Sequence, residues 1–358
     1  MKITTKLGVI TLLVPVIAFN NCKLHASLTN INSSDSNVNI EFTSLNDICY
    51  PSWFNSSLKI NITDSDLKKF NRLKQKQYIL NDIFAQNKFE VHSENFVVSS
   101  NLEKEINEVI NSSTKVFSFY VTSIDKKISF GYNPDQKYSC ASSIKAPYSL
   151  FCYKQIEKGV SSLDEVKNYT NNFYSTGTGI MQNEQQKCYT IRDILYNTIH
   201  YSDNIGYGML YDYFGVEEYN LMVASLGCDY LKLTPYSKWG FASPREMVLV
   251  WQEIYNYKDT EYGRIFFDDL LNAKYNFIKN SLPDKDIAHK SGYSIRGYND
   301  HGIVFDDVTP YIISVMLPYP DETDNHKQLL DKTVKLSDKV IEEYNIYLEN
   351  NKTKELTR

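Results

Sequence analysis

Strand patterns stand at the two ends of one long stretch of this chain, and helical patterns lie between them. Alternating apolar residues predict strands at 115–124, 127–132, 287–293, 302–305 and 311–317. Helical periodicity predicts one helix that ends near residue 158 and others at 101–112, 190–199, 204–214, 217–226, 244–255 and 325–348. A sheet built from both ends pairs strands that are far apart in sequence. We therefore expect an α+β fold, in which terminal helices flank a mostly antiparallel sheet and the central helices form a second lobe across a cleft.

The composition is that of a globular protein without an obvious nucleic-acid surface. The chain has 358 residues, is 42% apolar and carries a net charge of −5 with acids and bases mixed. Its six cysteines show no disulfide framework and its six histidines show no metal-ligand spacing. We therefore expect a monomer with no metal and no cofactor, in which Cys140 and Cys152 are small buried hydrophobes.

The first residues resemble an export signal. Lys2 and Lys6 precede an apolar run at 7–19, and a cleavage site could lie before Ser27. We interpret 1–26 as a signal peptide and the protein as extracytoplasmic, while an uncleaved anchor or lipidation at Cys22 stays open.

The region from 27 to 99 is predicted to be a Ser/Asn-rich tether followed by an N-terminal extension of unknown role. Helical periodicity covers 64–87, where a run of basic residues is either a solvated face or a contact with the cell wall or a membrane surface. The catalytic domain is expected to span 100–350, and 351–358 is interpreted as a tail.

Residues 140–147 (CASSIKAP) join a strand pattern to an apolar helix pattern. Ser142 would lie at the mouth of that helix, and Lys145 follows one turn later on the same face. A serine hydroxyl needs a neighbouring base to become a nucleophile, and a lysine in a poorly hydrated cleft can lose its charge and serve. The pattern Ser-x-x-Lys occurs five times in this chain, so by itself it also fits a surface serine beside a solvated lysine.

Two further motifs follow in order. Ser202-Asp203-Asn204 lies between two helical patterns, and Lys290-Ser291-Gly292 lies on a strand. Each also has a plain structural interpretation, because Ser202 or Asp203 could cap the next helix and Gly292 could mark a strand bulge.

The ordered set S-x-x-K, S-D-N, K-S-G resembles the signature of class A β-lactamases and penicillin-binding proteins. Sixty residues separate Ser142 from Ser202, which is similar to the class A spacing. The resemblance covers about 100–350 and implies the β-lactamase-like fold. It also implies that the small-molecule substrate is a β-lactam or a peptide ending in D-Ala-D-Ala.

The resemblance implies a role for each matching residue. Ser142 would be acylated, Lys145 would help to deprotonate it, and Ser202 would pass a proton to the departing nitrogen. The backbone N–H groups of Ser142 and Tyr293 would bind the developing oxyanion. Among the substrate-binding residues, Asn204 would hold Lys145 and the substrate amide, Lys290 and Ser291 would receive the substrate carboxylate, and Gly292 would let the substrate backbone lie against the strand.

One departure from the class A pattern concerns deacylation. Those enzymes carry a glutamate in an E-x-x-L-N loop between the second and third motifs. Here residues 230–245 contain no Asp or Glu, and the 88 residues from Ser202 to Lys290 make a shorter interval than in that class. Glu246 is expected on the surface, and Glu217 and Glu218 at a helix N-terminus.

Three functional interpretations follow. The first is a β-lactamase-like hydrolase with slow deacylation. The second is a D,D-peptidase of the penicillin-binding type, and the third is a module that binds a β-lactam or wall peptide without turnover. A Ser-His-Asp triad around His289 or His301 is a fourth, disfavoured because the chain has no G-x-S-x-G elbow.

Overall fold

The computed structural model describes residues 89–112, 117–183, 187–318 and 325–356, together with five short strands in the first 60 residues. The chain divides into two compact units, Met1–Asp82 and Ile83–Arg358. In the first unit the five strands form an antiparallel sheet: β1 (Thr5–Lys6), β2 (Val9–Ile10), β3 (His25–Leu28), β4 (Val38–Thr43) and β5 (Ser57–Ile60). The helix predicted at 64–87 and most of the predicted signal at 1–26 lie outside the described residues.

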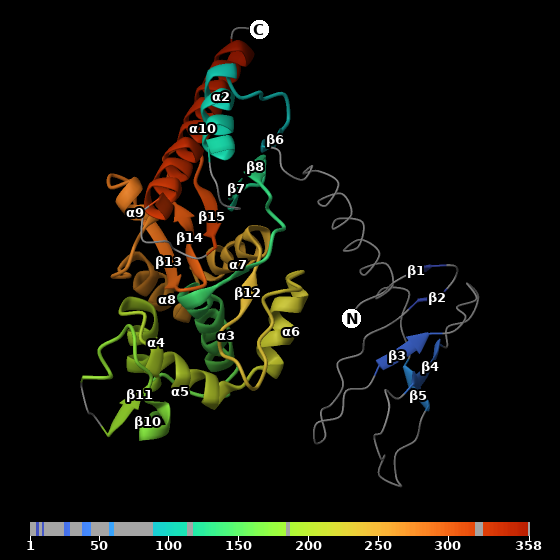
Figure 1. Ribbon diagram of the computed structural model, residues 1–358, viewed down its shortest axis with the longest axis vertical. Helices are drawn as coiled ribbons and strands as arrows, with labels where there is room; N and C mark the ends of the chain where they lie inside the picture. The colour runs from blue at the N-terminus through green and yellow to red at the C-terminus, as the bar shows by residue number, and fades with distance from the viewer. Residues whose placement is uncertain are drawn as a thin grey trace. The chain divides into compact units, whose positions relative to one another are not determined.

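The second unit is built on a six-stranded antiparallel sheet (Figure 1). In spatial order its strands are β13 (Ile287–Ser294), β14 (Gly297–Val304), β15 (Tyr311–Leu317), β7 (Ser118–Ser123), β8 (Ile128–Tyr132) and β6 (Phe89–Ser93). Strand β15 pairs with β7, so that Val315 lies opposite Phe119 across nearly two hundred residues of chain. The predicted pairing of strands from both ends of the domain is therefore confirmed, and β13 lies at one edge of the sheet.

Two predicted boundaries need correction. Strand β6 pairs with β8, placing Phe89 opposite Tyr132 and Val91 opposite Phe130, so the sheet includes chain that lies before the expected start at 100. Alternation in so short a strand, next to a helical pattern, gives little signal in the sequence. At the other end, α10 (Asn325–Leu356) runs through most of the segment that was interpreted as a tail.

The terminal helices cover one face of the sheet, as the sequence predicts. Helix α2 (Ser100–Ser112) lies against α10, and both pack on the sheet (Figure 1). Apolar residues such as Ile106, Val334 and Ile341 are nearly inaccessible there and share a core with Phe130 and Val315. Burial of this apolar surface drives the packing, because an isolated helix as short as α2 is marginal in water.

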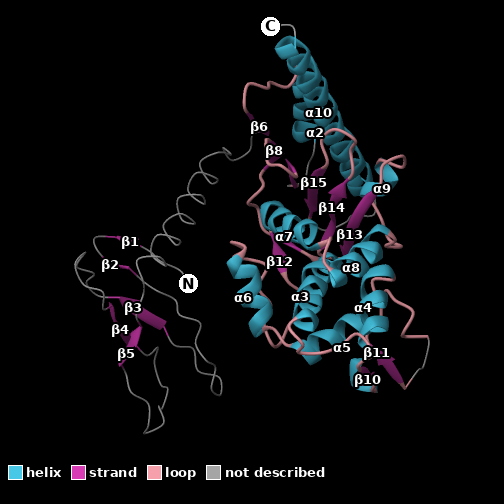
Figure 2. Cartoon of the chain, turned by 180° about the vertical axis from the view of Figure 1, so that it is seen from behind, coloured by secondary structure: helices cyan, strands magenta, loops and turns pink. Residues whose placement is uncertain are grey.

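Helices cover the other face and extend into a separate group (Figure 2). They are α3 (Lys145–Glu157), α4 (Ile191–His200), α5 (Asn204–Phe214), α6 (Glu217–Ser225), α7 (Pro244–Tyr257) and α8 (Glu261–Leu271), of which only α8 was not predicted. Shorter elements complete the unit: β9 (Tyr138–Ser139) paired with β12 (Phe241–Ala242), β10 (Val166–Asn168) paired with β11 (Cys188–Thr190), η1 (Ala141–Ile144), η2 (Asn171–Phe173) and α9 (Ile278–Ser281).

Side-chain caps explain where several of these helices begin. Thr190 and Asp193 form a capping box at α4, and Ser243 and Glu246 form another at α7. Asp203 caps α5. Within the described chain no helix combines the length and apolar character needed to cross a bilayer.

Candidate active site

The site is organised around the turn that carries Ser142. This residue lies in η1, immediately before α3, and its side chain is half-buried. The turn is held by the Cys140 carbonyl oxygen, which accepts hydrogen bonds from the Ser143 N–H (3.1 Å) and the Ser143 hydroxyl (2.7 Å). Ala141 has a φ of 48°, a region that alanine rarely occupies. Such strain persists only where the surrounding contacts impose it, and it presents Ser142 at the helix mouth.

Lys145 joins the serine turn to the S-D-N segment. Its ammonium nitrogen Nζ donates to Ser142 Oγ at 3.0 Å, to the Ser202 carbonyl oxygen at 2.6 Å and to Asn204 Oδ1 at 2.8 Å. It also lies 3.2 Å from Ser202 Oγ. The first and second motifs, predicted to converge, therefore meet at one nitrogen atom.

Burial makes this lysine a poor cation. Lys145 is 0% exposed, and its pKa is held well below the usual value first by desolvation and then by the nearby positive charges of Lys290 and Lys238. The carboxylate of Asp203 acts in the opposite direction but is outweighed. A lysine whose neutral form is favoured has a lone pair available as a base.

Ser202 and Asp203 occupy the connection between α4 and α5. Ser202 is 3% exposed and has a φ of 52°, another left-handed conformation in a residue with a side chain. The carboxylate of Asp203 accepts from the N–H groups of Ile205 (2.8 Å), Gly206 (3.0 Å) and Met181 (2.9 Å). Asp203 is thus the helix cap, and Ser202 is free to face the lysines.

A loop that sequence reasoning missed supports this segment from outside. Thr178 donates its hydroxyl to the Ser202 carbonyl oxygen at 2.6 Å, and the Thr176 carbonyl oxygen accepts from Asn204 Nδ2 at 2.9 Å. The sequence signal was the Thr-Gly-Thr-Gly run at 176–179, whose glycines both have positive φ.

Strand β13 brings the third motif to the same place. Lys290 is 1% exposed, and its Nζ donates to Ser202 Oγ at 3.0 Å and to the Ser291 carbonyl oxygen at 3.1 Å. Burial lowers the pKa of Lys290 to about 8, against the effect of Asp300. The Ser202 hydroxyl therefore lies between two amines. Ser291 donates its own hydroxyl to the Tyr275 carbonyl oxygen at 2.6 Å.

Gly292 is required by the serine turn itself. A Cβ at this position would come within 2.3 Å of the Cys140 carbonyl oxygen, 2.8 Å of the Ser143 nitrogen and 3.2 Å of the Ser142 nitrogen. The approach of a substrate was the expected reason for this glycine, and the approach of the strand to η1 is a nearer one. Tyr293 follows on β13 with its side chain 64% exposed.

The two histidines considered for a triad contact residues other than Ser142. His289 Nδ1 lies 3.2 Å from Oδ1 of the buried Asp300. His301 contacts Ser143 Oγ at 3.1 Å, and burial lowers its pKa to about 3. The hydrogen bonds of the described residues therefore place no histidine on Ser142, and His301 supports the turn from beneath.

The loop between α6 and β12 is the segment in which the class A pattern would have a glutamate, and residues 230–245 have none. It is fixed to the helical group by three side chains: Tyr207 donates to the Lys238 carbonyl oxygen at 2.5 Å, Asn220 bonds both backbone groups of Leu233 at 2.8 Å, and Tyr211 donates to the Thr234 carbonyl oxygen. The Trp239 ring centroid lies 5.5 Å from Lys145 Nζ. An amine and an indole thus border the site on this side.

Glu246 was expected on the surface, and that expectation is wrong. The residue is 6% exposed, and its Oε1 accepts from the N–H groups of Asp229 (2.5 Å) and Tyr230 (2.8 Å). It anchors the start of the loop while also completing the cap of α7. Glu217 and Glu218 do lie in the first turn of α6, as predicted.

No hydrogen bond in the described part of the chain joins a carboxylate to Ser142 or Lys145. The Asp300 carboxylate accepts hydrogen bonds from the N–H groups of Phe277 (2.8 Å) and Ile278 (2.9 Å) and contacts His289. Among the described residues, no cluster of His, Cys, Asp and Glu could hold a metal ion. Cys140 and Cys152 are free and fully buried.

Solved structures share this architecture. PBP-A aligns with a TM-score of 0.63 at 19% identity, covering 71% of this chain and 99% of PBP-A. A β-lactamase from Sphaerobacter thermophilus aligns with a TM-score of 0.61 at 18% identity, covering 67% of this chain and 97% of that one. A point mutant of PBP-A, solved as an acyl-enzyme complex with penicillin G, aligns with a TM-score of 0.62 at 20% identity, covering 68% of this chain and 97% of that one.

These likenesses establish the β-lactamase-like fold. No curated protein sequence matches the chain. The model of the β-lactamase enzyme family matches residues 101–344, which contain all three motifs. The chain therefore belongs to the β-lactamase enzyme family of serine hydrolases.

Proposed function

We propose that Ser142 is a nucleophile that β-lactams acylate, and that the resulting acyl group is released slowly. The observation that carries this proposal is the position of Lys145 Nζ, which lies within 3.2 Å of Ser142, Ser202 and Asn204 oxygens in a fully buried setting. Buried amines are costly, so a lysine placed in this way calls for a chemical role.

The contacts of Lys145 favour its action as a base on Ser142. The Ser202 carbonyl and Asn204 Oδ1 can only accept, so they can take the two N–H groups of a neutral amine. The lone pair is then available to the Ser142 hydroxyl. As the serine oxygen bonds to the lactam carbonyl carbon, its proton passes to Lys145 Nζ.

The departing lactam nitrogen must gain a proton when its bond to the carbonyl carbon breaks. Ser202 is suited to supply it, because its hydroxyl lies 3.0 Å from Lys290 Nζ and 3.2 Å from Lys145 Nζ. Ser202 would give its proton to the lactam nitrogen and recover the former Ser142 proton from Lys145 Nζ, which returns Lys145 to its neutral form and balances the step.

Strand β13 is suited to bind the rest of the substrate. Its backbone passes so close to the Ser142 nitrogen that the N–H groups of Ser142 and Tyr293 can serve one oxyanion. Lys290 would bind the substrate carboxylate, joined by Ser291 when its hydroxyl turns from the Tyr275 carbonyl oxygen, and Asn204 would bind the side-chain amide. These assignments rest on the position of the strand and on the chemistry of its side chains.

Slow deacylation follows from what surrounds the serine. Hydrolysis of the ester needs a base that can activate water, and residues 230–245 contain no carboxylate. Lys238 and Trp239 border the site instead.

Mass spectrometry of the intact protein after exposure to benzylpenicillin tests this proposal. We expect a stable adduct on the wild type and none on Ser142→Ala. The variant Ser112→Ala is a matched control, because Ser112 begins another Ser-x-x-Lys match. Absence of the adduct from the wild type, or its presence on Ser142→Ala, would refute the proposal.

A D,D-peptidase is the second candidate, favoured by the position of β13 at an edge of the described sheet. An edge strand offers backbone groups to an extended peptide. Release of D-Ala from a wall-type peptide, without turnover of β-lactams, would select the peptidase. Adduct formation without either product would select a module that binds without turnover.

Export forms a separate part of the proposal and rests on the sequence at 1–26 alone. Cell fractionation of the full chain, with replacement of Lys2 and Lys6 by Glu as the disrupting change, tests it. Recovery of the unmodified chain in the cytoplasm would contradict export.

A further inference from the structure

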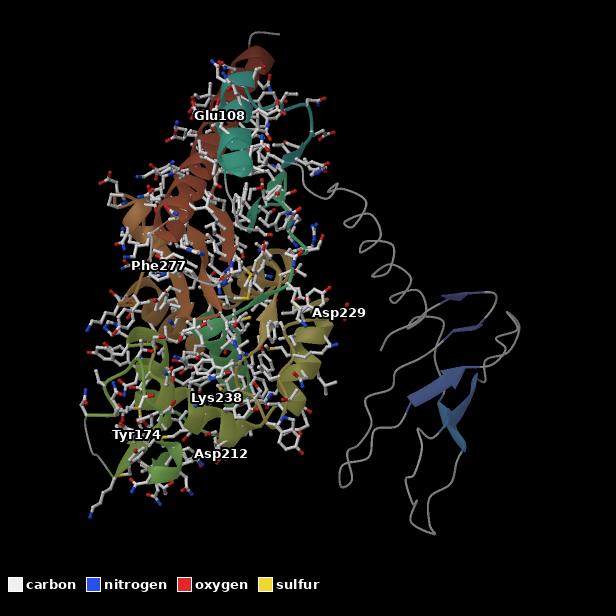
Figure 3. The ribbon with its side chains drawn as sticks, in the orientation of Figure 1. Glu108, Tyr174, Asp212, Asp229, Lys238 and Phe277 are labelled. Carbon is white, nitrogen blue, oxygen red and sulfur yellow. The ribbon has the colours of Figure 1, made fainter. Side chains whose placement is uncertain are left out.

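Lys238 is a charged residue of the site that the proposed chemistry leaves unused. Its Nζ donates to the Asn204 carbonyl oxygen at 3.3 Å and lies 5.7 Å from the Trp239 ring centroid. An ammonium has three N–H donors, and the described hydrogen bonds use one of them, on a neutral acceptor. Figure 3 marks Lys238 within the helical part of the second unit. Its amine thus lies beside Asn204, which also holds Lys145.

Among the described residues, no carboxylate forms a hydrogen bond or ion pair with the Lys238 amine. Asp203 is the acidic group that acts on Lys238, but its two oxygens already accept three backbone N–H bonds. Lys145 and Lys290 add two more amines to the site. Partial burial lowers the pKa of Lys238, as expected for an ammonium that lacks an anionic partner.

The Lys238 amine packs against α5 at Gly208. A Cβ on Gly208, one turn after Asn204 in α5, would come within 3.0 Å of Lys238 Nζ. Glycine inside a helix is destabilising by roughly 1 kcal/mol relative to alanine. Beside the amine, the 37% exposed Trp239 ring packs on Tyr207 with ring centroids 5.5 Å apart. The result is a partly open corner with one aromatic wall and one positive charge.

We infer that this corner selects substrates whose acyl side chain carries a carboxylate, with Lys238 as the residue that binds it. The inference rests on the proposed acylation of Ser142 and adds a substrate class to it. Lys290 and Ser291 would take the carboxylate on the leaving-group part of the substrate. Lys238, on the loop next to α5, would take a second anion on the acyl part.

Three penicillins that differ at one carbon test the inference. Benzylpenicillin is neutral at its side chain, α-carboxybenzylpenicillin is anionic there, and α-aminobenzylpenicillin is cationic. The measurement is the second-order rate of Ser142 acylation for each. We expect the wild type to prefer the α-carboxy compound. Lys238→Met should lower the ratio of the α-carboxy rate to the benzylpenicillin rate by about tenfold, the loss expected for one charge-assisted hydrogen bond.

Ratios are used because Lys238 also affects the pKa of Lys145, which changes all three rates together. Lys238→Arg should restore most of the preference, since it keeps the charge. Gly208→Ala should lower it in part, by displacing the amine. Lys232→Met is the matched control, because this lysine lies on the same loop but pairs with Asp229 at 3.7 Å.

The possible outcomes separate the two proposals. If the wild type forms no adduct with any of the penicillins, acylation fails and the substrate preference falls with it. If all three acylate Ser142 but Lys238→Met changes their rates by one common factor, acylation stands and the inference about Lys238 is wrong. A ratio that is lost in Lys238→Met, kept in Lys238→Arg and weakened by added salt in the wild type supports it.

Discussion

The serine turn and the loop between α6 and β12 border the same site, but they depend on their sequences in opposite ways. Lys145 bonds Ser142, Ser202 and Asn204, and Lys290 bonds the Ser202 hydroxyl, at distances of 2.6–3.2 Å. All of these bonds except the one to the Ser202 carbonyl oxygen need the side chains of both partners. The loop contributes its backbone to fixed anchors on the helices, and the side chains that face the site are an amine and an indole. One region is built for bond formation, whereas the other lacks the group that would complete hydrolysis.

The proposed function therefore separates acylation from deacylation within one fold. In that proposal the buried lysines around Ser142 generate the nucleophile, and the loop that borders the site contributes no carboxylate to activate water. Variants in each region test this separation.

Loss of the amine at Lys145 should have the largest effect. We expect Lys145→Met to slow acylation by at least about 10³-fold, within the range for a general base. Thermal unfolding should show unchanged or higher stability, because the variant removes a fully buried amine that lies near two others. A variant that is acylated at the wild-type rate would show that another group deprotonates Ser142.

A carboxylate in the loop should supply the missing step. We expect Trp239→Glu to shorten the lifetime of the penicillin adduct by about 10²-fold, because the indole lies 5.5 Å from Lys145 Nζ. Trp239→Gln is the control for lost packing on Tyr207. If the adducts of Trp239→Glu and Trp239→Gln have equal lifetimes, the lack of a loop carboxylate is not the reason for slow deacylation.

The rate of acylation should depend on pH through both lysines. Below the depressed pKa of Lys145, the neutral fraction and hence the rate should rise by about tenfold per pH unit. Above about pH 8, Lys290 loses its charge, and binding of the substrate carboxylate should weaken. Lys238→Met removes a charge that lowers the pKa of Lys145, so the rise of the acylation rate with pH should occur at higher pH in this variant. If the rise occurs at the same pH as in the wild type, Lys238 does not affect the pKa of Lys145.

The sequence predicted one of these two regions far better than the other. The ordered motifs at Ser142, Ser202 and Lys290 pointed to one site through their resemblance to the class A signature, and each lies on or beside a regular element with a strong pattern. Lys238 and Glu246 gave no such signal. Their importance comes from contacts with Asn204 and with the backbone of Asp229, and irregular loop geometry cannot be read from periodicity.

Glu246 tests whether the loop is held by its anchors rather than by its own sequence. Its carboxylate accepts two loop N–H groups, and burial raises its pKa, so the ionised form carries a desolvation cost in the native state. Glu246→Gln keeps one accepting oxygen and removes that cost, so we expect a loss of at most about 1 kcal/mol in unfolding free energy. Glu246→Ala removes the acceptor of two half-buried loop N–H groups and half of the α7 capping box, and should lose about 2 kcal/mol.

Chemical denaturation measures both losses, and limited proteolysis should show faster cleavage within 229–241 for the alanine variant. Acylation of Ser142 should change far less than in Lys145→Met, since the lysine network does not contact Glu246. If Glu246→Ala is as stable as the wild type, the loop keeps its conformation without this anchor. If Glu246→Ala instead abolishes acylation while remaining folded, the two regions are coupled, and the separation of bond formation from hydrolysis does not hold.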